Sequence, residues 1–256
     1  MLEPVLFIGH GSPMNIINKN DFTRAITDFG QKLTKPKAIL IVSAHWLSRG
    51  TAVTFTDSKL ETIYDFGGFP DELYYIRYNP IGSTELAIQI QEILRPIPVV
   101  LDSNRGLDHG AWSVLHHLFP KANIPVVQLS IDFTKSAQEN FEIAQKLSQL
   151  REQGVLIVAS GNLVHTFEDM DFDENAKEKT WALDFQNDFK KRLLTRDFTD
   201  LINYKNLKDW DKAINRADHY FPLLYALGAT QENDKLEIIF EGIQNATLSM
   251  LSFCFV

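Results

Sequence analysis

The chain has 256 residues, of which 45% are hydrophobic, and no stretch rich in Pro, Gly or Ser divides it, so we expect one domain with a sizeable core over residues 1–256. Its formal charge is −8, from 25 Lys and Arg against 33 Asp and Glu, and the basic residues are scattered, which excludes the footprint of a nucleic-acid-binding protein. The single cysteine, Cys254 in "SFCFV", excludes an internal disulfide framework and a multi-cysteine zinc site, and is predicted to pack in the core.

The N-terminus leads directly into a predicted strand, "PVLFIG" at residues 4–9. It lacks the basic segment, longer apolar stretch and cleavage site of a signal peptide, and no apolar run in the sequence is long enough to span a bilayer. We therefore expect a cytoplasmic protein without a membrane partner. No obligatory protein partner is evident in the sequence.

Apolar, β-branched runs flanked by turn residues predict further strands along the chain. They lie at residues 38–44, 51–55, 98–101, 124–131, 154–160, 235–240 and 249–256. Apolar residues at three- and four-residue steps predict helices at residues 22–33, 83–94, 136–153 and 181–194, with Ser83 and Ser136 as N-caps. This alternation predicts an α/β fold, a single-domain sandwich with a largely parallel or mixed central sheet flanked by helices.

Two connections have distinctive compositions. Residues 61–82, "ETIYDFGGFPDELYYIRYNPIG", combine several Tyr and Phe with Gly and Pro and follow neither a helical nor a strand period. Aromatic loops of this kind cap a core or line a pocket. Residues 167–179, "FEDMDFDENAKEK", are acidic and predict a solvent-facing loop.

Four of the seven histidines occupy similar places relative to the predicted elements. His10, His45 and His165 each come just after a buried-strand pattern, and His219 stands at the start of an apolar helical run. Because the ends of parallel strands lie along one edge of a sheet, we expect these residues to converge on one pocket. A single histidine is most often a surface or hydrogen-bonded core residue, but a set of three with open positions suits a catalytic ion such as Zn(II) or Fe(II).

The other three histidines are a functional candidate and a structural pair. His109, in "RGLDHGAW", is predicted to lie in a glycine-flanked loop with a functional role, oriented by Asp108. His116 and His117, in "SVLHHLF", are predicted as ordinary helix residues. Neither a phosphate-binding loop nor a GxSxG nucleophile elbow occurs in the sequence.

Seven motifs together resemble one known family. They occur in the order typical of the 4,5-DOPA extradiol dioxygenases, which are class III extradiol ring-cleavage dioxygenases of the protocatechuate 4,5-dioxygenase B-subunit superfamily. The motifs are "GHGSPM", "SAHW", "YDFGGFPDELY", "GLDHGAW", "PVVQLSID", "SGNLVH" and "DHYFPLLYALGA". They cover most of the chain from Leu6 to Ala229, so the resemblance implies one class III extradiol dioxygenase-like catalytic domain over residues 1–256.

The resemblance also implies roles for five histidines. The family's metal ligands are the histidines of "GHGSP" and "SAHW" and the histidine before "PLL", which correspond to His10, His45 and His219. His165, in "SGNLVH", corresponds to a residue beside the metal that acts as acid/base or, in zinc-loaded forms, as a fourth ligand. His109, in "LDHGAW", corresponds to one that touches substrate or oxygen.

The chain departs from the family pattern at two places. Thr166 stands where an asparagine usually follows the "SGNLVH" histidine, and residues 215–218, "NRAD", replace the common Pro-Thr-Pro-Glu. Neither change removes a ligand, so both bear on the shape of the pocket and hence on the substrate rather than on metal binding.

By this resemblance, the protein is a metal-dependent extradiol dioxygenase that opens the ring of a DOPA-like catechol with O2 to a muconic semialdehyde. Fe(II) is expected for activity, and Zn(II) is expected in purified protein because it binds such nitrogen sites more tightly. Candidates for an aromatic wall around the catechol, or for core packing, are Trp46, Tyr64, Phe66, Phe69 and Tyr220.

Two alternatives use the same histidines: a zinc-dependent hydrolase, and a non-enzymatic metal-binding scaffold of the Memo type. The sequence leaves open which catechol is used, which ring bond is cut, the physiological metal and the oligomeric state.

Overall fold

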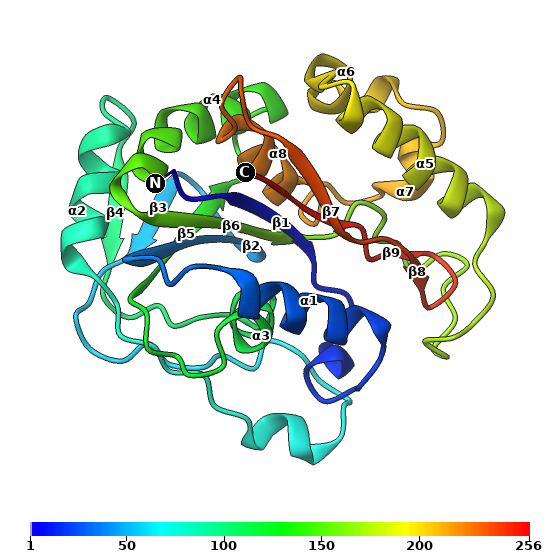
Figure 1. The fold of residues 1–256 in the computed structure, drawn as a ribbon, viewed down its shortest axis with the longest axis horizontal. Coiled ribbons are helices and arrows are strands. Elements are labelled where there is room, and N and C mark those ends of the chain that lie inside the picture. The colour runs from blue at the N-terminus through cyan, green and yellow to red at the C-terminus, as the bar shows by residue number, and fades with distance from the viewer. Residues whose placement is uncertain (1) are drawn as a thin grey trace.

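An eight-stranded sheet runs through the centre of the computed structural model, which describes residues 2–256 (Figure 1). The strands follow the spatial order β4-β3-β5-β2-β6-β1-β10-β7. Their bounds are β1 Val5–Gly9, β2 Ala38–Ser48, β3 Thr51–Thr54, β4 Val99–Asp102, β5 Val126–Asp132, β6 Val155–Gly161, β7 Leu236–Phe240 and β10 Ser252–Phe255. The short strands β8, Ile243–Gln244, and β9, Leu248–Ser249, pair with each other.

Parallel strands form the middle of the sheet. β5, β2, β6 and β1 are parallel neighbours, whereas β3 is antiparallel to β5, and β10 is antiparallel to both β1 and β7. β4 closes the other edge, parallel to β3. The predicted α/β fold with a largely parallel or mixed central sheet is therefore confirmed.

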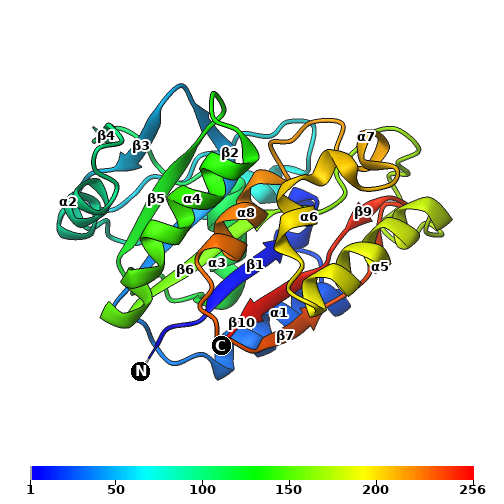
Figure 2. The ribbon, with the colours of Figure 1, turned by 90° about the horizontal axis from the view of Figure 1, so that it is seen from above.

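Helices cover both faces of the sheet (Figures 1 and 2). α1, Asp21–Lys32, and α3, His109–Leu118, pack together on one face, while α4, Ala137–Leu147, packs against α8, Phe221–Gly228, on the other. The remaining α-helices are α2 Thr84–Ile93, α5 Thr180–Leu194, α6 Phe198–Ile202 and α7 Trp210–Ala213.

Strand side chains alternate between two hydrophobic cores, as the period of two in a strand requires. In β1, Val5 and Phe7 belong to the core on the α4 and α8 side, whereas Leu6 and Ile8 belong to the core on the α1 and α3 side. Because both faces are covered, the sequence of β1 is continuously apolar. The first ionisable side chain after the strand is His10, one residue past its end.

The strand that carries His45 is longer than the sequence predicts. β2 continues to Ser48, so His45 lies inside the strand and not just after it. The pairing of β2 with β5 shifts register between Val42 and Leu47, an irregularity of the kind that re-aims a side chain next to a functional site. His45 lies within that irregular part of the strand.

Two other predicted elements end differently. The apolar run 249–256 is divided, because Met250 and Leu251 lie between β9, which pairs with β8, and β10, which pairs with β1 and β7. The helix predicted at 136–153 ends as α4 at Leu147 and continues as a 3₁₀ helix, Ser148–Gln153. Gly154, at φ +87°, then turns the chain into β6, a conformation that glycine adopts without strain.

Several local predictions are confirmed. The side chains of Ser83 and Ser136 cap α2 and α4, and Cys254 is buried. His116 and His117 lie within α3. Residues 167–179 form a connection whose side chains are mostly exposed.

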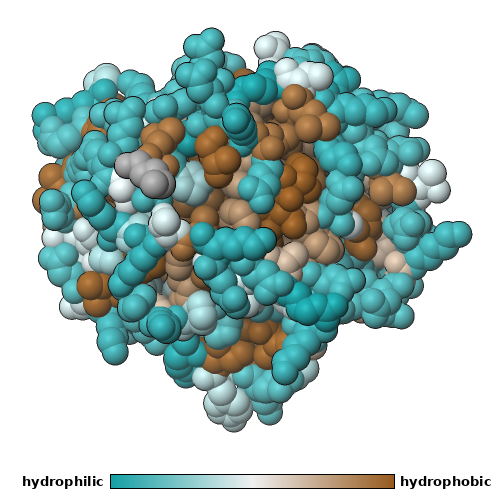
Figure 3. Space-filling view, in the orientation of Figure 1, coloured by the Kyte–Doolittle hydropathy of each residue, from teal (hydrophilic) through white to brown (hydrophobic). Residues whose placement is uncertain are grey.

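The surface is hydrophilic over most of the face seen in Figure 3, with hydrophobic residues gathered near its middle, over the edge strand β7. Most residues of β7 are only half-buried. Within residues 2–256, the structure contains no helix with the length and apolar character needed to cross a membrane.

Candidate metal centre

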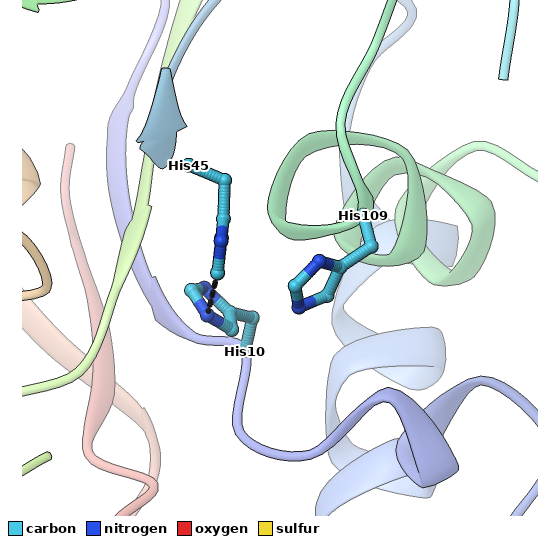
Figure 4. Close-up of side chains that lie close together, drawn as sticks. All are labelled: His10, His45 and His109. Carbon is cyan, nitrogen blue, oxygen red and sulfur yellow. Dashed lines mark hydrogen bonds between the residues drawn. The ribbon is translucent and has the colours of Figure 1, made fainter. Parts of the chain in front are cut away.

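Five histidines from separate parts of the chain meet at the carboxyl-terminal edge of the parallel strands. His10 follows β1, His45 lies in β2, His165 follows β6, His109 begins α3, and His219 precedes α8. The ring of His45 lies 5.1, 4.9 and 4.0 Å, between centroids, from the rings of His10, His219 and His109. Figure 4 shows His10, His45 and His109 pointing toward one another.

His10 is held in one tautomer by its hydrogen bonds. Its Nδ1 lies 2.9 Å from the hydroxyl oxygen of Ser160, and that hydroxyl donates its proton to the carbonyl oxygen of Gly110 at 2.6 Å. Since the carbonyl can only accept, the Ser160 oxygen must accept from Nδ1–H of His10. The lone pair of His10 therefore lies on Nε2, which faces the centre of the cluster.

Asp65 binds two histidines at once. Its Oδ1 accepts hydrogen bonds from the backbone N–H of His109 at 2.8 Å and from Nδ1 of His109 at 3.0 Å, while Oδ2 lies 3.4 Å from Nδ1 of His45. Burial raises the pKa of the Asp65 carboxyl, but the hydrogen bonds from His109 outweigh it and lower the pKa to about 2. The ionised carboxylate only accepts, so His109 carries its proton on Nδ1, and the nearby Oδ2 favours the same tautomer for His45.

The structure corrects the predicted role of Asp108. His109 does not lie in a loop oriented by its neighbour, because it is the first residue of α3 and its carboxylate partner is Asp65. Asp108 is instead the N-cap of α3, accepting from the Ala111 N–H at 3.1 Å and from the Ser43 hydroxyl at 2.6 Å. Its buried carboxylate fixes the start of the helix that presents His109.

His219 and His165 lie on the other side of the cluster. Nδ1 of His219 lies 3.2 Å from the carboxylate of Asp218, which leaves Nε2 of His219 without the proton. The ring of His165 stacks face to face on His219, with centroids 3.6 Å apart and planes 6° from parallel. The backbone N–H of His165 donates to the carbonyl of Ala213 at 3.1 Å, which fixes the turn after β6.

Burial keeps these imidazoles neutral. It lowers the pKa of His10 well below its ordinary value, and repulsion from His45 and His219 adds to the effect. Burial also lowers the pKa of His45 to about 4, that of His219 to about 3, and that of His165 below its usual range. Neutral imidazole is the form that binds metal ions.

The donor set fits a metal ion. One ring nitrogen from each of His10, His45 and His109 lies within 4.8 Å of the other two. Nε2 of His10 and Nε2 of His45 are 3.2 Å apart, a contact drawn in Figure 4 as a hydrogen bond, which would need a proton on one of the two atoms. The contacts with Ser160 and Asp65 instead favour Nδ1–H on both rings and a lone pair on each Nε2. Two lone pairs that face each other at this distance repel. A metal ion between them would be bound by both, which removes the repulsion.

The backbone at Gly110 leaves the room that this arrangement needs. A Cβ at this position would lie 2.5 Å from the Ser43 hydroxyl oxygen, 2.8 Å from Cδ2 of His45 and 3.4 Å from Cε1 of His10. The glycine after His109 thus lets α3 start directly against the rings of His45 and His10.

The aromatic candidates fall into three places. Phe66 packs edge-on against the His109 ring at 5.5 Å, and Tyr64 and Phe69 pack against Phe66, so these three aromatic residues cluster beside the site. Trp46 is buried under the guanidinium of Arg105. Tyr220 is a core residue whose hydroxyl donates to the carbonyl of Leu201.

The two departures from the family pattern touch each other. The Nδ2 of Asn215 donates to the hydroxyl oxygen of Thr166 at 3.1 Å, next to His165. Asp218, the last residue of the second departure, still supplies the carboxylate that bonds His219. Sequence reasoning missed Asp65, Ser160 and Asp218 as partners of the histidines, although all three lie within or beside motifs that contain a candidate site.

Five histidines gathered at the carboxyl-terminal edge of a parallel sheet, three of them with nitrogens close enough to share one ion, define an α/β metal-binding protein. The chain belongs to the family described as the catalytic LigB subunit of aromatic ring-opening dioxygenase, whose profile matches residues 4–256. It is therefore an extradiol aromatic ring-opening dioxygenase, an enzyme that uses a metal cofactor and O2 on a small-molecule substrate.

The chain is similar to proteins with related names over nearly its whole length. A protein from Escherichia coli (strain K12) named 4,5-DOPA dioxygenase extradiol is 44% identical over 97% of this chain and 93% of its own. A protein of the same name from Mirabilis jalapa is 36% identical over 93% of this chain and 91% of its own. The crystal structure of an uncharacterized protein from Escherichia coli K12 aligns with a TM-score of 0.86 at 40% identity, covering 99% of this chain and 100% of that one.

Proposed function

We propose that this dioxygenase opens the ring of a DOPA-like catechol with O2, giving a muconic semialdehyde, and that it uses Fe(II). The observation that carries the proposal is the cluster of histidines whose Nδ1 atoms face oxygen atoms of Ser160, Asp65 and Asp218, which favours an unprotonated Nε2 on each ring. The names of the relatives support the substrate class. Bound at this cluster, Fe(II) would act as a Lewis acid toward both catechol oxygens and supply electron density to O2.

We assign His10, His45 and His219 as the metal ligands. Their ring centroids are 5.1, 4.9 and 5.3 Å apart, a nearly even triangle. Three imidazoles bound to one ion at about 2.1 Å, with angles of about 90–110°, place their ring centroids about 4.6–5.3 Å apart. His109, and not His219, supplies the third nitrogen of the set that lies within 4.8 Å, but its ring is less evenly placed, 4.0 Å from His45 and 5.7 Å from His10. On this ring spacing we assign His109 to the substrate or O2.

This assignment predicts opposite effects of two alanine variants. His219→Ala should lose bound iron, with affinity falling by more than about 100-fold, because a missing ligand costs more than the 10–100-fold typical of an outer contact. His109→Ala should keep its iron and lose activity. The measurement is iron per chain after anaerobic reconstitution and desalting, with His116→Ala as control. If His109→Ala loses the metal and His219→Ala keeps it, His109 is the third ligand instead.

His165 is placed to move protons. It stacks on the assigned ligand His219, and within residues 2–256 its ring makes no hydrogen bond to another residue. A catechol must lose its hydroxyl protons to bind through both oxygens, and a neutral imidazole here is suited to accept one and return it as the ring opens. Both atoms of O2 enter the product as the carbon–carbon bond beside the diol breaks, so the reaction needs no external reductant.

A panel of catechols tests the substrate class. The protein is reconstituted anaerobically with Fe(II), mixed with O2 and each catechol, and followed for O2 uptake and for a yellow ring-fission product. We expect one O2 consumed per ring opened, with DOPA among the substrates. Turnover of ester or amide substrates without O2 uptake would instead favour the zinc-dependent hydrolase, and binding of metal without any turnover would favour a scaffold of the Memo type.

Three predictions from the sequence accompany this proposal. Residues 1–256 form one catalytic domain, the protein is cytoplasmic, and it works without nucleic acid, a membrane or an obligatory protein partner. A first check is activity and size of the purified chain in solution.

A further inference from the structure

Asp65 lies in a segment that the structure holds firmly. It belongs to the aromatic residues 61–82, where the N–H of Ile63 donates to the carbonyl of Leu107 at 2.8 Å and the indole N–H of Trp112 donates to the carbonyl of Ile63 at 2.9 Å. Phe66, on the other side, packs against the His109 ring. The Asp65 side chain is 26% exposed, and the two hydrogen bonds that its Oδ1 accepts from His109 hold the carboxylate against the histidines.

We propose that Asp65 is a positioning residue that fixes the tautomers of His45 and His109, so that both rings present an unprotonated Nε2 to the metal and the substrate. The inference rests on the proposed function of the histidine cluster, and adds to it a residue that acts through two others. One carboxylate can do this because its two oxygens face different rings, Oδ1 toward His109 and Oδ2 toward His45.

The geometry predicts which histidine changes its tautomer when the carboxylate of Asp65 is replaced by an amide. In Asp65→Asn, one oxygen is replaced by an NH2 group, which donates and does not accept. The amide oxygen must stay at the Oδ1 position, because the backbone N–H of His109 points there and cannot lose its proton. The NH2 group then faces Nδ1 of His45, and that ring is forced to carry its proton on Nε2, where it no longer binds a metal.

The wild-type protein provides the first test. Its zinc-loaded form is diamagnetic, so long-range ¹H–¹⁵N spectra of protein labelled at histidine report where each ring carries its proton. We expect Nδ1–H on both His45 and His109. A proton on Nε2 of His109 in wild-type protein would overturn the inference without any variant.

Two variants and a control provide the second test. Asp65→Asn should bind zinc about 10–100-fold more weakly, the usual cost of losing an outer contact to a ligand histidine, while His109 keeps its Nδ1–H. Asp65→Ala should weaken zinc binding and also release the tautomer of His109. The control is Asp71→Asn, a change of the same charge at an exposed carboxylate of the same segment, which should bind zinc as wild type does.

Zinc affinity of Asp65→Asn within about twofold of the Asp71→Asn control would overturn the inference, whichever substrates the enzyme uses. The expected tautomers and affinities in a protein that opens no catechol would leave the inference standing and reject the proposed function. The two failures are therefore distinguishable.

Discussion

Exchanging iron for zinc is expected to abolish ring opening while the metal site stays filled. Zn(II) has no accessible redox change, so it can bind the catechol oxygens and yet cannot supply electron density to O2. The general affinity order also favours Zn(II) over Fe(II) at nitrogen ligands, so purified protein is expected to carry zinc and to be inactive as isolated. The measurement is O2 uptake with a catechol at equal metal loading.

Replacing the zinc by iron in the same sample gives the control for this exchange. Chelation followed by anaerobic addition of Fe(II) should restore the rate to the same sample, and elemental analysis of the zinc form accounts for residual iron. Equal rates of ring opening by the zinc and iron forms, at matched loading, would make the proposed redox mechanism wrong.

The bounds of a strand can be predicted from the sequence where the strand is buried along its whole length, because its run of apolar residues then matches the strand. β1 and β6 are covered on both faces, so their apolar runs predict their bounds to within about one residue. β2 extends further than its apolar run because Leu47 and Ser48 pair with Ile131 and Asp132 of β5. That pairing depends on a neighbouring strand far away in the sequence, and no local pattern contains it.

The histidine cluster is predictable for a topological reason, and its partners are not. Parallel strands end at one edge, so three histidines near strand ends indicate a shared site before any distance is known. The partner of His109, in contrast, is Asp65, 44 residues away on a segment without a helical or strand period. The adjacent Asp108 is the obvious candidate in the sequence, but the helix uses its carboxylate as a cap.

The family resemblance identifies Thr166 and Asn215 as departures from the expected motifs, but it does not show that the two residues are in contact. Both positions depart from the family pattern, and the structure joins them by a hydrogen bond beside His165. This contact lies next to the residue proposed to move protons, and it leaves the proposed ligands in place.

Replacing His165 by Gln should separate proton transfer from metal binding. Glutamine keeps a polar group of similar reach but cannot carry a proton between substrate oxygens, and the contribution of such a group is typically about 10²–10⁴-fold. Bound iron should stay near the wild-type level while ring opening slows by this factor. In His10→Ala, by contrast, iron and activity should be lost together, because His10 faces the lone pair of His45 at 3.2 Å.

Bound iron and single-turnover ring opening are measured on the same samples, with His116→Gln in α3 as the matched control. An iron-replete His165→Gln protein with near-normal rate would reject the catalytic role. Loss of iron from that variant would make His165 a fourth ligand. The stacking of His165 on His219 at 3.6 Å does not favour this outcome. The in-plane lone pairs of two parallel stacked rings run side by side, so they do not point to one common ion. The expected result, full iron and slow chemistry, would assign His165 to proton transfer with the substrate and not to the metal.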